Sequence, residues 1–211
     1  MTDPTTSIHP DTTLGAVHLT VAALDRSIEF YQQTLGFQLL DRYENSVSLG
    51  PPGAGRGFLA LTEAPSAPKV SRSTGLYHFA ILVPGRRELA LALRRLLVKR
   101  RQPQGFADHG VSEAIYLADP DDNGIEIYRD RPRTEWPFQN GSLQMVSERL
   151  DLEGLMDEIR SETGGSAEEP YALAPGTILG HIHLRVASIP AAESFYTKVL
   201  GFDLIQNYGS S

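Results

Sequence analysis

The sequence contains a 33-residue segment that occurs twice. Residues 14–46 and residues 179–211 align without gaps at a spacing of 165 positions, and 14 of the 33 aligned residues are identical. Average composition would give roughly two identities by chance. The repeat therefore marks a duplicated folding unit, and it keeps a histidine inside an apolar run, His18 in the first copy and His183 in the second.

Length and charge limit the classes of protein to consider. The chain of 211 residues is long enough for one or two domains. Its formal net charge of −7 argues against a nucleic-acid partner or an acidic membrane surface, and the absence of cysteine excludes disulfides and thiolate metal sites. The polar N-terminus lacks an apolar signal core and no apolar run reaches membrane-spanning length, so we expect a cytoplasmic protein.

The first copy of the repeat begins a β-α-β-β-β unit. Alternating apolar residues over 16–21 predict a strand, and Asp25 can cap a helix that Gly36 ends. The turn-rich segment PPGAGRG separates the last two expected strands. We expect the helix over 25–35 and the strands over 16–21, 37–43, 46–49 and 57–61.

The same order of elements follows from Leu76 onward. A strand over 76–83 precedes a Leu- and Ala-rich helix over 86–100. The sequence DPDDNG, residues 119–124, predicts a hairpin turn because Asn-Gly suits a tight primed turn. We expect further strands over 104–106, 112–118 and 124–128.

These units predict an α+β fold. Paired βαβββ modules are expected to form a curved mixed sheet around a trough, followed by a partial third module. The chain then divides into four parts. Residues 1–13 are expected to be a flexible arm, residues 131–175 a connector with a short helix over 151–160, and residues 178–211 an incomplete third module. The first domain, 14–130, holds the modules 14–63 and 76–130.

Three polar side chains lie on the sheet faces that the helices do not use. Because side chains alternate along a strand, His18, His78 and Glu126 each lie opposite an aliphatic face. Small neighbours, Ala80 and Gly124, leave room beside them. If the two modules curl into one trough, the two imidazoles and the carboxylate can converge there. Two histidines and one carboxylate with open coordination positions suit non-haem Fe(II) or Mn(II).

The phrases VHLTVAALDRSIEFYQQTLGF, YHFAILV and above all YLADPDDNGIEIY resemble the vicinal oxygen chelate superfamily. That group includes glyoxalase I, extradiol catechol dioxygenases and the fosfomycin and bleomycin resistance proteins. The resemblance covers residues 14–130 and 178–211 and is closest to the two-domain catechol-2,3-dioxygenase type, with the second domain truncated. It implies that His18, His78 and Glu126 are metal ligands.

Two more residues are candidates for the catalytic chemistry. Tyr116 lies on the strand face that can reach Glu126, and His109 lies in the loop that enters the same strand. In an extradiol reaction a neutral histidine could accept a catechol proton, and a tyrosine hydroxyl could hydrogen-bond the bound substrate oxygen. His181, two residues before His183, is expected to be a surface or interface residue.

Glyoxalase I, by the same resemblance, carries a fourth metal ligand in the last strand of its first module. Here Ala60 occupies that position. Glu63 lies three residues later, so its side chain is expected on the opposite face of the strand. This disfavours a glyoxalase, although a shifted register could bring Glu63 into place.

The sequence therefore favours a metal-dependent extradiol ring-cleaving dioxygenase that takes a catechol-like aromatic diol and dioxygen. Fe(II) is the expected metal, with Mn(II) possible. Two alternatives stay open: a non-redox protein that binds or sequesters a small molecule, and a glyoxalase-type lyase or transferase that uses Zn or Ni.

The incomplete third module predicts self-association. Ile182, Leu184 and Val186 would form an apolar strand face next to an unpaired edge, which invites pairing with another strand. We expect a homodimer or an aggregation-prone monomer.

Overall fold

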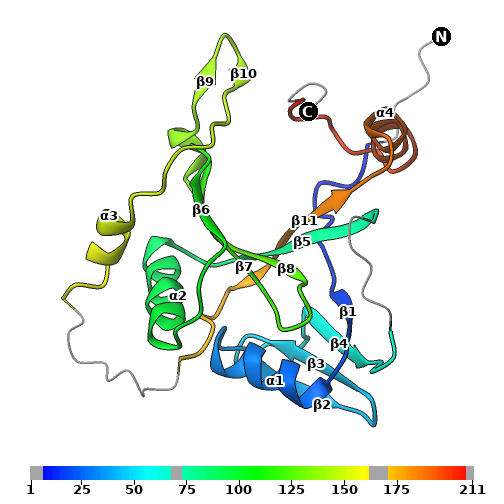
Figure 1. Cartoon of the computed structure of the whole chain (residues 1–211). Coiled ribbons are helices and arrows are strands. Elements are labelled where there is room, and N and C mark those ends of the chain that lie inside the picture. Colours follow the sequence, from blue (N-terminus) through cyan, green and yellow to red (C-terminus); the bar gives the residue numbers. More distant parts are fainter. Residues whose placement is uncertain (1–6, 68–72, 162–170, 208–211) are drawn as a thin grey trace.

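The computed structural model describes residues 7–67, 73–161 and 171–207. Its first module follows the expected β-α-β-β-β order and forms a sheet of four strands in the order β1-β4-β3-β2 (Figure 1). Strand β1 pairs in parallel with β4, and the other neighbours pair antiparallel. Its elements are β1 (Val17–Val21), α1 (Leu24–Gln33), β2 (Gln38–Arg42), β3 (Ser46–Gly50) and β4 (Leu59–Glu63).

The core of the first module forms because α1 and its sheet each carry one apolar face. Along β1, buried apolar residues alternate with exposed polar ones, and the apolar row continues into β4 and β3, where Leu61 pairs with both Leu19 and Val47. Helix α1 buries Ile28, Phe30 and Tyr31 against this row. The apolar spacing of the sequence therefore predicts this module closely.

The second module has the same order of elements and forms a larger sheet, β11-β5-β8-β7-β6, with α2 packed against β8. Strand β5 pairs in parallel with β8, as β1 does with β4. The predicted βαβββ modules and the α+β class are confirmed. The second module consists of β5 (Gly75–Leu82), α2 (Arg86–Val98), β6 (Gly105–Asp108), β7 (Ser112–Ala118) and β8 (Gly124–Asp130).

The turn between β7 and β8 fixes the position of β8. Asp119 Oδ1 accepts hydrogen bonds from the backbone amides of Asp121 and Asn123, and the positive φ of the turn is taken by Asp122 (φ 68°). The hydroxyl of Tyr31 on α1 donates to Asp119 Oδ2 at 2.9 Å. The turn therefore also ties the two modules together.

The two modules lie in separate sheets, and the strand that joins the second module is β11 (Ile178–Arg185) from the third. Strand β11 runs antiparallel along β5, with register shifts on either side of the segment His181–His183. Figure 1 shows β11 alongside β5 across the middle of the molecule. The sheet that carries the candidate residues is thus built from the second and third modules.

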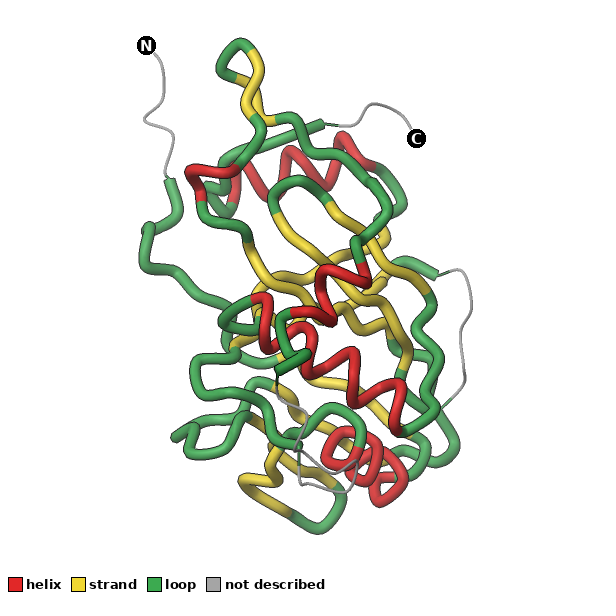
Figure 2. Tube along the Cα trace, turned by 90° about the vertical axis from the view of Figure 1, so that its left-hand side faces the viewer, coloured by secondary structure: helices red, strands yellow, loops and turns green. Residues whose placement is uncertain are grey.

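The connector packs onto the second module. The short helix α3 (Leu152–Asp157), capped by the side chain of Asp151, buries Leu155. Arg86 of α2 donates to the Gly154 carbonyl and pairs with Glu158 and with the buried Glu113. Seen from the side of α2 and α3 in Figure 2, these helices lie in front of the strands. Before α3 the connector holds η1 (Arg133–Glu135) and the hairpin of β9 (Phe138–Gln139) and β10 (Ser142–Leu143).

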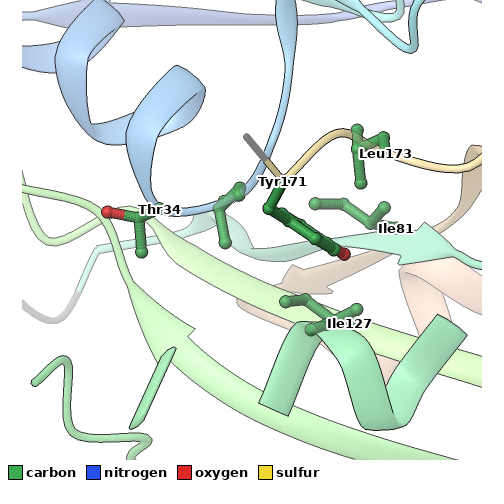
Figure 3. A pocket seen from close by; sticks show the side chains of 7 residues that line it. Thr34, Ile81, Ile127, Tyr171 and Leu173 are labelled. Carbon is green, nitrogen blue, oxygen red and sulfur yellow. The ribbon is translucent and has the colours of Figure 1, made fainter. Parts of the chain in front are cut away.

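After the connector, the chain crosses between the modules and ends in the third one. Tyr171 and Leu173 line a narrow apolar pocket together with Thr34 and Ile127, and the pocket is too small for a water molecule (Figure 3). Beyond β11 follow α4 (Ile189–Ser194) and the π-helical turn η2 (Phe195–Val199). In the described residues, no helix is long and apolar enough to cross a membrane. The predicted domain boundaries stay predictions, and part of the expected N-terminal arm, residues 1–6, lies outside the described residues.

Candidate metal centre

One row of paired residues crosses the larger sheet and builds the candidate site. His181 on β11 pairs with Ala80 on β5, Ala80 with Glu126 on β8, and Glu126 with Tyr116 on β7. Paired residues lie side by side on one face of a sheet. His78 lies two residues before Ala80 on β5 and so shares this face.

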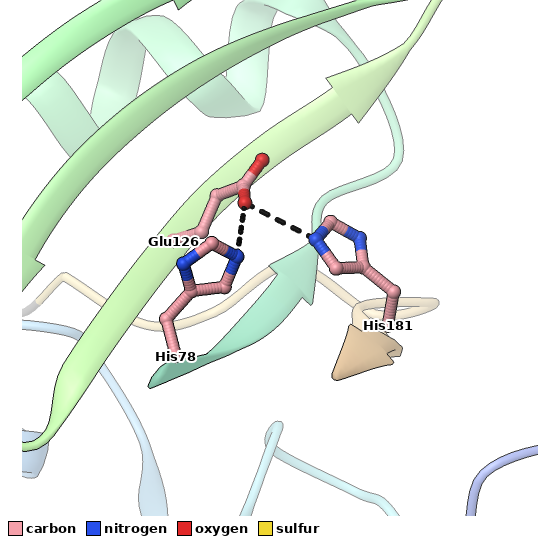
Figure 4. Close-up of side chains that lie close together, drawn as sticks. All are labelled: His78, Glu126 and His181. Carbon is pink, nitrogen blue, oxygen red and sulfur yellow. Dashed lines mark hydrogen bonds and ion pairs between the residues drawn. The ribbon is translucent and has the colours of Figure 1, made fainter. Parts of the chain in front are cut away.

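His78, Glu126 and His181 point toward one another (Figure 4). Glu126 Oε2 lies 2.9 Å from His78 Nε2 and 3.1 Å from His181 Nε2, and the three ligand atoms all lie within 4.8 Å of one another. The side chains of His78 and Glu126 are almost fully buried, whereas that of His181 is 43% exposed. The site therefore opens to solvent beside His181.

The donor set and its spacing fit a divalent metal ion. If each ligand atom lies about 2.1 Å from an ion, two ligand atoms at right angles to each other lie about 3 Å apart. The distances from Glu126 Oε2 to the Nε2 atoms of His78 and His181 match this spacing. Among the described residues, the buried His78 Nε2 has no hydrogen-bond partner, although it lies 2.9 Å from Glu126 Oε2 in an ion-pair contact. A buried nitrogen of this kind is costly unless something binds it. Two imidazoles and one carboxylate suit non-haem Fe(II).

The electrostatics keep Glu126 ionised and ready to bind a cation. Burial on its own would raise the pKa of this carboxyl, but the adjacent His181 and His78 outweigh it and lower the pKa to about 2. His183 packs edge-on against His78, with ring centroids 4.7 Å apart. Burial, followed by the nearby His78 and His181, lowers the pKa of His183, which favours its neutral form.

Two glycines allow the strands to approach the ligands. A Cβ at Gly124, which pairs with His78, would lie 2.2 Å from the Tyr77 carbonyl oxygen. A Cβ at Gly180 would lie 2.1 Å from the hydroxyl of Tyr128, whose ring packs against His181 at a centroid distance of 4.8 Å. Gly180 also lies where the register of β11 shifts. It therefore lets His181 turn toward Glu126.

His109 and Tyr116, the two predicted catalytic residues, contact each other beside the three ligands. His109 Nδ1 lies 2.9 Å from the Val146 carbonyl oxygen and Nε2 lies 2.9 Å from Tyr116 Oη. A carbonyl oxygen only accepts, so the proton of neutral His109 is on Nδ1 and Tyr116 donates to Nε2. Burial and then the charge of Glu126 raise the pKa of Tyr116, so it stays a protonated phenol.

Comparison with known proteins gives the family. The chain matches the Glyoxalase/Bleomycin resistance protein/Dioxygenase superfamily over residues 13–127 and 178–210. It belongs to this superfamily. It is also 47% identical to the catechol-2,3-dioxygenase of Bacillus subtilis over 206 residues. The aligned region covers 96% of this chain and 70% of that protein.

The solved structures that match this chain share less sequence with it. A glyoxalase/dioxygenase from Nostoc punctiforme is 18% identical with a TM-score of 0.49, over 59% of this chain and 97% of its own. The cppA protein of Streptococcus pneumoniae is 24% identical with a TM-score of 0.48, over 63% of this chain. The match spans 52% of that protein, about half of its length.

The sequence predicts His18, His78 and Glu126 as metal ligands. The structure brings together His78 and Glu126 but not His18. His18 lies exposed on β1, in the other sheet, where it pairs with Ala60. In the part of the chain that the structure describes, it joins no group of potential metal ligands. Glu63 accepts a hydrogen bond from the Leu24 amide at the start of α1, so it serves that helix.

His181, expected at a surface or interface, takes the third position, and the repeat contains a signal for it. The first strand of each module ends at a valine or one residue before it, at the equivalent positions Val21, Val83 and Val186. Five residues earlier stand Ala16 (21 − 5), His78 (83 − 5) and His181 (186 − 5). Aligned in this way, His18 corresponds to Ala80 and His183, and its partner Ala60 corresponds to Glu126. The first module therefore has alanine at both ligand positions.

Proposed function

We propose that this chain is a metal-dependent extradiol dioxygenase that cleaves the ring of a catechol-like aromatic diol. The observation that carries the proposal is the convergence of His78, Glu126 and His181, with ligand atoms within 4.8 Å of one another. The 47% identity to a catechol-2,3-dioxygenase supports the same activity and substrate class.

His78, Glu126 and His181 would hold the ion, and the donor set favours Fe(II), with Mn(II) as the next candidate. Bound Fe(II) would supply Lewis-acid activation of the diol and reaction with dioxygen, through the positions that three protein ligands leave open. Because His181 is the most exposed ligand, the substrate would enter on its side of the site.

Tyr116 and His109 would move the substrate proton. Tyr116 Oη is hydrogen-bonded to His109 Nε2, which carries no proton when the ring is neutral. As the diol gives a proton to Tyr116 Oη, Tyr116 can pass its own proton to His109 Nε2. The Val146 carbonyl then steadies the resulting imidazolium through its contact with Nδ1.

Anaerobic loading with Fe(II), followed by catechol and air, tests the proposal. We expect one dioxygen consumed per ring-opened product, and loss of both in the His78→Ala variant. If the loaded chain binds catechol without consuming dioxygen, it is a binding protein. Turnover of an oxygen-free substrate with Zn or Ni would instead indicate a lyase or transferase.

The expected homodimer remains a prediction.

A further inference from the structure

Two carboxylates face each other where the loop that carries His109 begins and ends. Asp108, the last residue of β6, pairs with Glu113 on β7. Like charges directly opposite each other on paired strands repel. Glu113 is only 1% exposed, so water screens this repulsion weakly. The two strands that hold the loop of residues 109–111 therefore need a cation between these carboxylates.

Arg131, which follows β8, supplies this cation. Its Nη2 donates to Asp108 Oδ2 at 2.6 Å and to Glu113 Oε1 at 3.3 Å. Arg86 and Arg129 also donate to Glu113. In the described part of the chain, only Arg131 donates to Asp108 as well. Hydrogen bonds between ionised groups are stronger than those between neutral groups. Arg131 therefore joins the end of β6 to β7.

The backbone of Arg131 is fixed to the same loop. Its amide donates to the Val111 carbonyl at 2.7 Å. Asp108 uses its second oxygen, Oδ1, to accept from the Gly110 amide at 2.8 Å. Arg131 and its partner Asp108 therefore hold the loop on both sides of His109.

The connector holds His109 from the other direction. The Val146 amide donates to the His109 carbonyl at 3.2 Å, and His109 Nδ1 lies 2.9 Å from the Val146 carbonyl oxygen. Asp108 exchanges two backbone hydrogen bonds with Glu148, at 3.0 and 2.8 Å. Asp108 therefore lies between the connector and β7, and a shift of Asp108 moves His109 with it.

We propose that Arg131 is a positioning residue for His109. By holding Asp108 against β7, it keeps His109 Nε2 within hydrogen-bond distance of Tyr116 Oη. The carboxylates that pair with Arg131 all lie outside the candidate metal site, so metal binding should not depend on it. The effect on turnover rests on the proposed function, whereas the effect on the hydrogen bonds of His109 can be measured in the metal-free chain without substrate.

Turnover tests the role of Arg131 first. We expect Arg131→Met to lower kcat for catechol about tenfold or more, while KM and the affinity for Fe(II) stay unchanged. Added to His109→Gln, the same change should cost little more, because it acts through His109. Arg131→Lys should stay within about threefold of the native chain, since one nitrogen of Arg131 reaches both carboxylates. The matched control is Arg42→Met, which breaks the exposed ion pair with Asp25 and should leave kcat unchanged.

A second change tests the cause of the loss. Asp108→Asn removes the negative charge that Arg131 neutralises but keeps the oxygen that accepts from Gly110. We therefore expect Asp108→Asn to restore most of the kcat that Arg131→Met loses. Should Arg131→Met not fold, Arg131→Gln, whose amide can still donate to one carboxylate, takes its place.

Nitrogen NMR of the metal-free chain with isotope-labelled histidine reports the hydrogen bonds of His109, and the His109→Gln variant assigns its signal. In the native chain we expect the neutral tautomer with its proton on Nδ1, and an Nε2 signal shifted by the hydrogen bond from Tyr116. Arg131→Met should remove this shift, and Asp108→Asn added to it should bring the shift back.

Each readout can overturn the proposal. An unchanged His109 signal in Arg131→Met would do so, whether or not the chain cleaves catechol. So would a loss of kcat that Asp108→Asn does not restore, or one that comes with weaker Fe(II) binding. A chain that shows the expected NMR changes but no ring cleavage would support the role of Arg131 in placing His109 and would overturn the proposed function alone.

Discussion

His181 and Glu126 contact each other across an intervening strand: His181 is on β11, Glu126 is on β8, and β5 lies between them. Their Nε2 and Oε2 atoms lie 3.1 Å apart above Ala80, which pairs with both residues and is fully buried. A methyl group is small enough to let the two longer side chains meet above it. The contact of His181 with Glu126, on which the proposed third ligand position rests, therefore depends on a small residue at position 80.

A larger side chain at this position should separate the ligands. We expect Ala80→Leu to weaken the binding of Fe(II), or of Co(II) as a spectroscopic substitute, by about tenfold or more. Titration calorimetry measures the affinity, and circular dichroism checks the fold. Ala80→Ser, which adds one atom, is the control and should bind nearly as the native chain does. Equal affinity in the leucine variant would contradict this geometry.

The hydrogen bond between Tyr116 and His109 should matter for turnover and not for metal binding. We expect Tyr116→Phe and His109→Gln each to lower kcat by about 10- to 100-fold while the affinity for Fe(II) stays unchanged. Because the two residues act as one relay, the double variant should lose little more than either single variant. Tyr43→Phe, at an exposed tyrosine, should have no effect. Fully multiplicative losses would show that the two residues act independently.

Gly180 should be intolerant of a side chain. A Cβ there would lie 2.1 Å from the Tyr128 hydroxyl and 2.8 Å from Leu82 Cβ. We expect Gly180→Ala to lower the free energy of unfolding by about 1–3 kcal/mol, measured in urea, and to weaken metal binding through His181. Gly15→Ala, where a Cβ would meet open space, is the matched control. Similar unfolding curves for both variants would refute the close approach.

Glu126 should make the metal-free chain sensitive to acid. The pKa of this carboxyl is lowered from 4.5 to about 2 in the folded chain, so the unfolded chain binds the proton more tightly. The stabilisation is therefore complete above about pH 4.5 and is lost as the pH falls toward 2. In EDTA, the difference in free energy of unfolding between the native chain and Glu126→Gln should shrink over this range. A difference that does not change with pH would argue against the lowered pKa.

The local structure of both modules could be predicted because it depends on neighbours in the sequence. Apolar alternation identifies β5 and β8, and strand parity places His78 and Glu126 on the same face. The pairing of β11 with β5 could not be predicted in the same way. Strand parity determines which face of the sheet a side chain occupies. The partner of a strand such as β11 depends instead on where a distant strand leaves a free edge.

The third ligand shows the same limit. Aligning the two copies makes His18 and His183 equivalent, and it favours the histidine that both copies keep as the ligand. The structure instead brings His181 beside His78 and Glu126, where the first copy has Ala16, so the informative position is one at which the copies differ. An alignment of all three first strands on Val21, Val83 and Val186 separates the two registers.

Counting bound metal tests the central claim most directly. The native chain, His181→Ala and His18→Ala are each loaded anaerobically with Fe(II), freed of excess metal and analysed for iron per chain. We predict one ion in the native chain and in His18→Ala, and none in His181→Ala. Iron retained by His181→Ala but lost from His18→Ala would contradict the site described above.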